Sequence, residues 1–431
     1  MSTLRRELGL ADTTAVVIGA IIGVGIFYTP TSVAKLAGSE DRALLAWALG
    51  GLAAGLGAVT FAALGRRYPR AGGQYDIVRD AWGPMLGFLY VFCNLTAIQT
   101  GTIAIISLIA VENLGVALNG VAPASAVPGA LVLMVGVGIA NAAGVRWGAR
   151  LQNVTVVAKL VTLGAVIALG VASPAAVREG STVPTTSASL WTALLPTLFA
   201  YGGWQQALWV GGEVKDGERT LPRAILLGVT VVVIVYLGAA WADFRLLGFD
   251  GVANSSALAA DAVGAAFPGS GARIAGGAVA LSAFGVLNAD LLTGPRLVLA
   301  LAADGRFFAP FARIDPRTGT PVLAILLLTA LSALLLVIAG PDGVDPLTAW
   351  VVVVDAAFFA LTGLALVKLG GSGVPAVVPV AFAALELGAI YGAVADPAVR
   401  GAAGVGLAWI FGAAVVYLAF FRQRLPLRPR D

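Results

Sequence analysis

The chain has 431 residues, of which 59% are hydrophobic and 12% are charged, and its mean hydropathy is +0.92. So little polar surface cannot cover a soluble fold of this size, which indicates a polytopic membrane protein of the all-α class. The chain has one cysteine, Cys93, and no histidine, so intrachain disulfides, cysteine-based metal sites and histidine-dependent catalysis or proton relays are excluded.

Twelve apolar runs are long enough to cross a bilayer, which takes roughly 20 helical residues. The first run follows Arg5 and Arg6 without a cleavable signal pattern, and we expect it to remain as the first membrane helix. The predicted spans are residues 11–35, 43–65, 85–114, 124–144, 151–172, 190–212, 222–245, 271–301, 320–340, 347–368, 373–394 and 401–421.

The distribution of Lys and Arg gives these spans an orientation. With the N-terminus inside, 20 of the 27 basic residues fall in inner segments, six fall in outer segments and Lys159 lies within a span. Because cytoplasmic segments collect Lys and Arg, we expect a multi-pass protein of the cell membrane with both termini in the cytoplasm. The net charge of +4 then reflects topology, and no nucleic-acid partner is expected.

Two glycine breaks interrupt the apolar spans, Gly23 to Gly25 in the first and Gly202-Gly203 in the sixth. Corresponding breaks in two halves of a membrane protein indicate a binding site at the bilayer midplane, because a broken helix frees backbone groups that a ligand can satisfy. Small-residue helix packing is the alternative explanation. Since the first span runs outward and the sixth inward, we predict two five-helix units of opposite topology, residues 1–172 and 190–369, followed by residues 373–431 with two helices and a basic tail.

Several motifs then carry a resemblance to a known family. They are GAIIGVGIF at 19–27, PRAGGQY at 69–75, FAYGGW at 199–204, GEVK at 212–215, ERTLPRAI at 218–225 and LSAFGVLN at 281–288, with Lys159 and Arg296. In this order and spacing the chain resembles the amino acid–polyamine–organocation (APC) superfamily, in particular its L-type amino acid transporter branch. The resemblance implies a leucine-transporter-like fold with a five-plus-five inverted repeat and two additional helices.

The resemblance also implies a substrate site at the two breaks. N–H groups at the first break would bind the substrate carboxylate, which suits the positive end of a helix dipole. Carbonyls of the sixth span would bind the amine, and Phe199 would close over the substrate as a lid, although a plain core phenylalanine is the alternative. The residues implied are Ile22, Gly23, Val24, Gly25, Phe199, Ala200 and Gly202.

Lys159 is the single residue that points most directly to a function. Placing a lysine deep in a membrane span costs free energy, so such a residue is by default a functional hypothesis. It follows Arg150 by nine residues, or roughly 14 Å of helix, which argues against a side chain that reaches back to the interface. In sodium-independent APC members a lysine stands where related proteins bind sodium. The resemblance therefore implies that Lys159 contacts a carbonyl near Gly19 and lies by Ser282.

Three carboxyl groups also fall in or near the spans. We expect Asp290 to form an ion pair with Arg296, which is close in sequence. Asp355 lies on the tenth span, which lines the substrate path in related transporters, so an acid there would favour a cationic substrate if it faces the cavity. Glu386 lies outside the ten-helix core, and we assign it a packing or oligomer role.

The glycine pairs lie within membrane spans and follow no strand, so a dinucleotide or phosphate loop is not expected, nor are an enzyme activity, a cofactor or a metal site. We therefore predict a sodium-independent secondary amino acid transporter, driven by exchange or by protons, that carries uncharged side chains. The alternatives are a carrier of cationic amino acids or polyamines and a membrane sensor that binds amino acid without transport. No partner subunit is evident beyond the substrate and the lipid bilayer.

Overall fold

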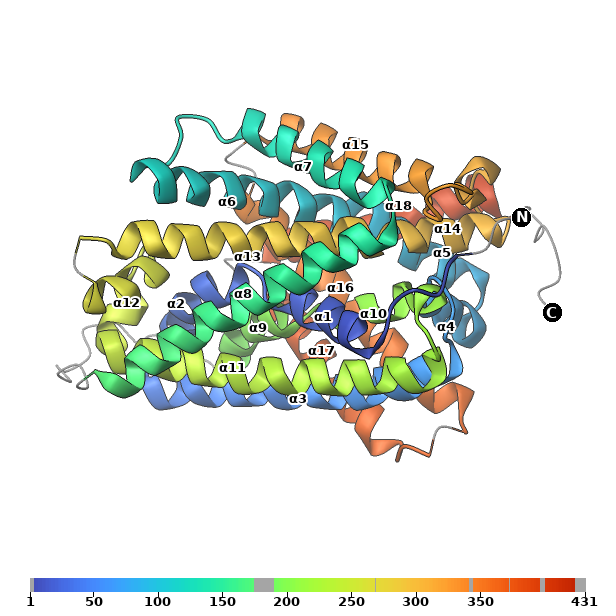
Figure 1. The fold of residues 1–431 in the computed structure, drawn as a ribbon. Helices are drawn as coiled ribbons and strands as arrows, with labels where there is room; N and C mark the ends of the chain where they lie inside the picture. The colour runs from blue at the N-terminus through green and yellow to red at the C-terminus, as the bar shows by residue number, and fades with distance from the viewer. Residues whose placement is uncertain are drawn as a thin grey trace.

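The computed structural model describes residues 4–173, 190–267, 269–340, 344–371, 373–395 and 400–422. Within these ranges the chain is helical, and its only β pairing consists of two isolated bridges, Leu8 with Val214 and Ala71 with Val210. The long helices lie roughly along one direction in a single bundle, with α4 and α14 at one end and α12 at the other (Figure 1).

The helices correspond in position to the predicted spans. The first part of the chain forms α1 (Leu10–Ile21), α2 (Gly25–Ala37), α3 (Glu40–Arg67), α4 (Gly73–Trp82), α5 (Pro84–Cys93), the π-helix η1 (Asn94–Ile98), α6 (Gln99–Asn119), α7 (Val127–Ala142) and α8 (Val145–Ala172). The second part forms α9 (Leu190–Tyr201), α10 (Gln206–Trp209), η2 (Gly211–Glu213), α11 (Gly217–Asn254), α12 (Leu258–Ala266), α13 (Gly271–Thr293), α14 (Pro295–Ala303), η3 (Ala309–Ala312), α15 (Val322–Ala339), α16 (Val344–Leu369), α17 (Val377–Ala395), α18 (Arg400–Val416) and η5 (Tyr417–Phe421).

Length and apolar composition identify the membrane helices. Among the described residues, eight helices are long and apolar enough to cross a membrane, and α1 with α2 makes a ninth span bent by 43°. The chain is therefore a multi-pass membrane protein. The count of twelve spans, the inverted repeat and the division at 1–172, 190–369 and 373–431 stay predictions. Arg178 and the basic tail beyond residue 422 lie outside the described residues.

The broken helices lie inside the bundle, where longer helices surround them. Helix α1 packs against α8 and α11, while α2 and α3 both pack against α9. A cluster of aromatic rings fixes the chain just after the second break, since Trp204 stacks on Phe359 with ring centroids 5.2 Å apart and meets Phe61 and Phe382 edge to face. This packing holds the two interruptions in place at the centre of the protein.

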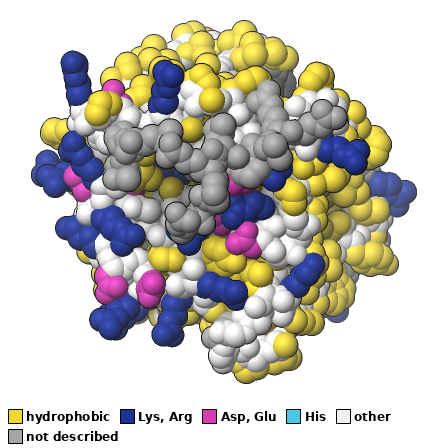
Figure 2. Space-filling view, turned by 90° about the vertical axis from the view of Figure 1, so that its right-hand side faces the viewer, with side chains coloured by type: hydrophobic (Ala, Val, Ile, Leu, Met, Phe, Trp, Pro, Cys, Tyr) yellow, Lys and Arg dark blue, Asp and Glu magenta, His cyan; other side chains and the backbone are white. Residues whose placement is uncertain are grey.

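Basic side chains gather on the end of the bundle where α1 begins. Figure 2 looks onto this end and shows many Lys and Arg side chains around a few acidic ones. Arg5 bonds the carbonyl of Pro316 and Arg146 pairs with Glu7 at this end, so the N-terminal segment is tied to the loops there. We refer to this end as the basic end. Its charge is the pattern that the positive-inside rule associates with the cytoplasmic side.

Candidate functional site

The first helix stops and restarts at the predicted position. Helix α1 ends at Ile21, residue Ile22 takes an extended conformation (φ −70°, ψ 90°), and α2 starts at Gly25. Gly23 is held close to α13, because a Cβ atom there would lie 3.1 Å from the side chain of Val286. The break therefore leaves backbone groups exposed to the interior of the bundle, where they need partners.

Side chains from three neighbouring helices satisfy the freed carbonyl groups. Lys159 of α8 donates from Nζ to the carbonyl oxygens of Gly19 (3.1 Å) and Ile22 (2.6 Å). Ser282 of α13 donates from Oγ to Gly23 (3.1 Å), and the hydroxyl of Tyr236 on α11 donates to Ile21 (2.9 Å). The structure thus brings Lys159 and Ser282 to the break, with the lysine ammonium on the carbonyl of Gly19.

The N–H groups at this break are less fully paired. The backbone of Gly23 forms a hydrogen bond with the Tyr236 side chain, whereas the N–H of Val24 donates no backbone hydrogen bond among the described residues, and Gly25 opens α2. Unpaired N–H groups at the start of a helix, combined with its dipole, favour an anion. The paired carbonyls and the N–H of Val24 at the start of α2 make this break a candidate anion site.

The sixth predicted span breaks beside the first. Helix α9 ends at Tyr201, and Gly203 has φ of +125°, a conformation that side chains rarely adopt. A Cβ atom on Gly203 would lie 2.7 Å from the carbonyl oxygen of Ala20, so the two breaks touch through backbone. The N–H of Gly203 is held by Gln205 Oε1, whereas within the described chain the carbonyls of Ala200 and Gly202 accept no loop hydrogen bond. These carbonyls are free to accept bonds from a ligand.

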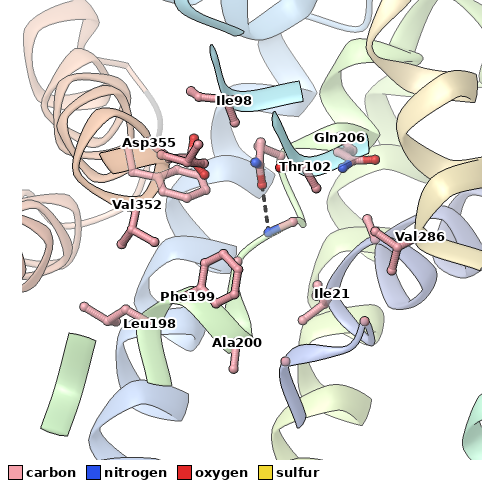
Figure 3. Close-up of a pocket in the computed structure, with 18 of the residues that line it drawn as sticks. Ile21, Ile98, Thr102, Leu198, Phe199, Ala200, Gln206, Val286, Val352 and Asp355 are labelled. Carbon is pink, nitrogen blue, oxygen red and sulfur yellow. Dashed lines mark hydrogen bonds between the residues drawn. The ribbon is translucent and has the colours of Figure 1, made fainter. Parts of the chain in front are cut away.

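A cavity of about 120 Å³ lies between the breaks, and Figure 3 shows the side chains around it. A larger cavity of about 560 Å³ adjoins it on the side away from the basic end and is lined by α2, α6 and α9. Phe199 lines both cavities and is 40% exposed, so it stands between the small cavity and the open side. Its position suits a lid, and its role stays a prediction.

The acidic side chains lie differently from the prediction. Arg296 pairs with Glu213 (2.9 Å), while Asp290 accepts a hydrogen bond from Gln206, so the expected Asp290–Arg296 ion pair is wrong. Six residues are well over one and a half helical turns and turn the two side chains to different faces. Glu386, to which we assigned a packing or oligomer role, is 4% exposed and lines the small cavity together with Asp355, so it does not lie on a surface open to an oligomer partner.

Sequence reasoning missed the polar side chains of the third span. Gln99 and Thr102 line the small cavity directly after the π-helix η1, where an extra residue in the turn shifts the following side chains. Gln205 and Gln206, which also line it, follow the second break. The sequence shows only that these glutamines lie within or beside apolar spans. That position does not predict the direction in which their side chains point.

The basic end is closed beneath the cavity. The buried Arg296–Glu213 pair joins α14 to η2, and Gln74 of α4 accepts hydrogen bonds from Tyr90 and Trp209. Tyr75 donates to Asp304 at 2.6 Å, and burial together with this bond raises the pKa of the tyrosine, so its hydroxyl keeps its proton. These contacts close the described part of the basic end, whereas the larger cavity lies on the opposite side.

Comparison with known proteins agrees with this geometry. Residues 8–421 match the family model described as amino acid permease. The chain belongs to this family, within the APC superfamily. This permease is 29% identical to the serine/threonine exchanger SteT of Bacillus subtilis over 371 residues, which cover 83% of each chain.

Two mammalian relatives match over a shorter share of their length. The large neutral amino acids transporter small subunit 2 of Mus musculus is 32% identical over 353 residues, which cover 78% of the permease and 65% of that relative. The Asc-type amino acid transporter 1 of Homo sapiens is 30% identical over 348 residues, which cover 78% of the permease and 66% of that relative. All three relatives are named as transporters or exchangers of amino acids, not as enzymes.

Proposed function

We propose that this permease is a sodium-independent secondary transporter that binds an α-amino acid at the two helix breaks. The observation that carries the proposal is a difference between the two breaks. The first break leaves a backbone N–H group unpaired, and the second leaves backbone carbonyl groups unpaired. Among the described residues, the N–H of Val24 is free for a carboxylate, and the carbonyls of Ala200 and Gly202 are free for an amine. An α-amino acid carries both groups on one carbon, and the breaks are in contact.

Lys159 supports the independence from sodium. Its ammonium occupies the carbonyl oxygens of Gly19 and Ile22, which are the type of ligand that a sodium ion would need. Gly285 on α13 makes room for it, since a Cβ atom there would lie 2.8 Å from Nζ. The Lys159 side chain thus stands between α1, α8 and α13, where it takes up carbonyl oxygens that an ion would otherwise need.

The difference between the open side of the protein and its closed basic end supports alternating access. The small cavity adjoins a large cavity on one side, while buried polar contacts such as Arg296–Glu213 close the basic end. With the basic end in the cytoplasm, this is an outward-facing conformation. The cycle would open the basic end by breaking those contacts once substrate is bound and Phe199 has closed.

Uptake into liposomes tests the proposal. Purified protein is reconstituted, loaded with unlabelled amino acids, and assayed for uptake of labelled L-amino acids with sodium replaced by choline at two external pH values. We expect unchanged uptake in choline, and loss of uptake without sodium would contradict the proposal. A rate that is indifferent to pH would indicate exchange, whereas a rate that rises at acidic external pH would indicate proton coupling.

The same assay separates a transporter from a sensor. A sensor would bind amino acid with the same affinity and release none across the membrane. The larger cavity on one side and the closed contacts on the other are what a carrier needs in one of its two states, and this favours transport. Binding without uptake would decide for the sensor.

A further inference from the structure

The cavity between the breaks is lined by acidic side chains and, among the described residues, by no basic one. Asp290 of α13, Asp355 of α16 and Glu386 of α17 all line it. Figure 3 shows Asp355 on the wall opposite Val286, with its carboxyl group directed toward the cavity. Three helices therefore bring carboxyl groups to the place where the substrate side chain would lie.

Two of these carboxyl groups, Asp355 and Glu386, have no partner of opposite charge among the described residues, whereas Asp290 interacts electrostatically with Lys159. Asp290 accepts one hydrogen bond from Gln206 through Oδ1, and its Oδ2 has no hydrogen-bond partner in the described chain. Neither Asp355 nor Glu386 has a hydrogen bond or an ion pair with any described residue. A carboxylate held within a membrane protein is costly unless a positive charge meets it, and a cationic ligand in the cavity would supply that charge.

An amide at the same cavity gives independent support. Gln99 is 4% exposed and lines the cavity, and its Oε1 atom has no hydrogen-bond partner in the described part of the chain. A buried acceptor without a donor costs free energy until a ligand supplies an N–H group. Unpaired acceptors beside carboxylates match a ligand that carries several N–H donors and a positive charge.

We propose that Asp355 and Glu386 bind the positively charged end of the substrate side chain. The preferred substrates are then L-amino acids with a terminal amino group, such as lysine, in place of the uncharged side chains expected from the sequence. The inference rests on the proposed function, because the helix breaks hold the α-carboxylate and α-amine and leave the side chain to the acidic wall. The shared wall of the two cavities gives a long side chain room.

Two ligands that differ in a single charged group test this inference. L-lysine and L-norleucine share their carbon skeleton, and norleucine lacks only the terminal amine. Binding of both to purified wild-type protein is measured by calorimetry, and then to Asp355→Asn and Glu386→Gln. Removing one partner of a buried charge pair costs about 2 kcal/mol or more, so we expect lysine affinity to fall at least about 30-fold in Asp355→Asn while norleucine affinity changes less than about threefold.

Asp243→Asn is the matched control, because Asp243 is a buried carboxyl on α11 that lines a separate cavity of about 30 Å³. It should leave both affinities unchanged, and an equal loss of lysine affinity there would overturn the inference. If Asp355→Asn does not fold, Glu386→Gln decides, with the same expected loss. A lysine preference that survives in both variants would also overturn the subsite.

Failure of the inference is distinguishable from failure of the proposed function. One outcome would refute the acidic subsite and leave the proposed function standing. In that outcome norleucine binds tightly to wild type, Gly25→Val abolishes this binding, and lysine binds weakly to wild type and to all the variants. If norleucine uptake carries protons and Asp355→Asn removes this coupling, the carboxyl groups bind protons and the inference is again refuted. If no common L-amino acid binds wild type, both fail.

Discussion

Replacing Lys159 by methionine should shift the protein toward the conformation that is open at the basic end. Methionine keeps the length of the side chain but removes the ammonium that holds the carbonyls of Gly19 and Ile22. Hydrogen bonds to charged groups contribute about 1.5–3 kcal/mol each, so about 3–6 kcal/mol ties α8 to the end of α1. If only a third of this is lost when α1 moves, the population ratio of the two conformations changes by a factor of about 5 to 30.

Thiol labelling measures that ratio. Ser32→Cys places a reporter in the larger cavity, and native Cys93 is fully buried, so a membrane-impermeant reagent reads the outward-facing population. We expect Lys159→Met to slow labelling, because the outward-facing fraction falls, and to reduce turnover more than affinity. Thr162→Val is the matched control on α8, because the Thr162 hydroxyl bonds only the carbonyl of Ala158 in its own helix. Equal labelling rates in wild type and Lys159→Met would refute the reasoning.

Three further changes test the site and its support. Gly25→Ala should keep amino acid binding, because the added Cβ meets backbone of α9 at an ordinary 3.4 Å, whereas Gly25→Val should abolish binding measured by calorimetry with folded yield unchanged. Phe199→Ala should lower the uptake rate, while Trp204→Phe, at a side chain 2% exposed, should mainly lower the thermal unfolding temperature. Arg296→Met should cost about 3–5 kcal/mol of stability by leaving Glu213 buried and unpaired, and the double variant with Glu213→Gln should regain most of it.

Much of the fold could be predicted because the bilayer restricts the choices. Apolar length places the membrane helices, although α11 extends beyond its predicted span of 222–245 at both ends, and glycines within such spans mark the breaks, as Gly203 does with its positive φ. Lys159 was also predictable, since a lysine at the middle of α8 must find oxygen atoms in the protein interior.

The side-chain directions inside the bundle could not be predicted in the same way. Helices buried on all sides show weak amphipathic periodicity, so the sequence did not place Glu386 in the cavity or separate Asp290 from Arg296. The extra residue in η1 changes the direction in which the side chains of Gln99 and its neighbours point, and nothing in the local sequence marks that change. Proximity in sequence was a poor guide, because Arg296 finds its partner Glu213 on another segment.

The central claim is that backbone groups at the two breaks bind the carboxylate and the amine of one amino acid. Calorimetry on the purified permease tests it directly with three ligands, namely the L-amino acid that binds best, its decarboxylated amine and its deaminated acid. The account predicts that both analogues bind at least about 30-fold more weakly than the amino acid, because each leaves one set of buried backbone groups unpaired. Equal affinity of either analogue would contradict the claim.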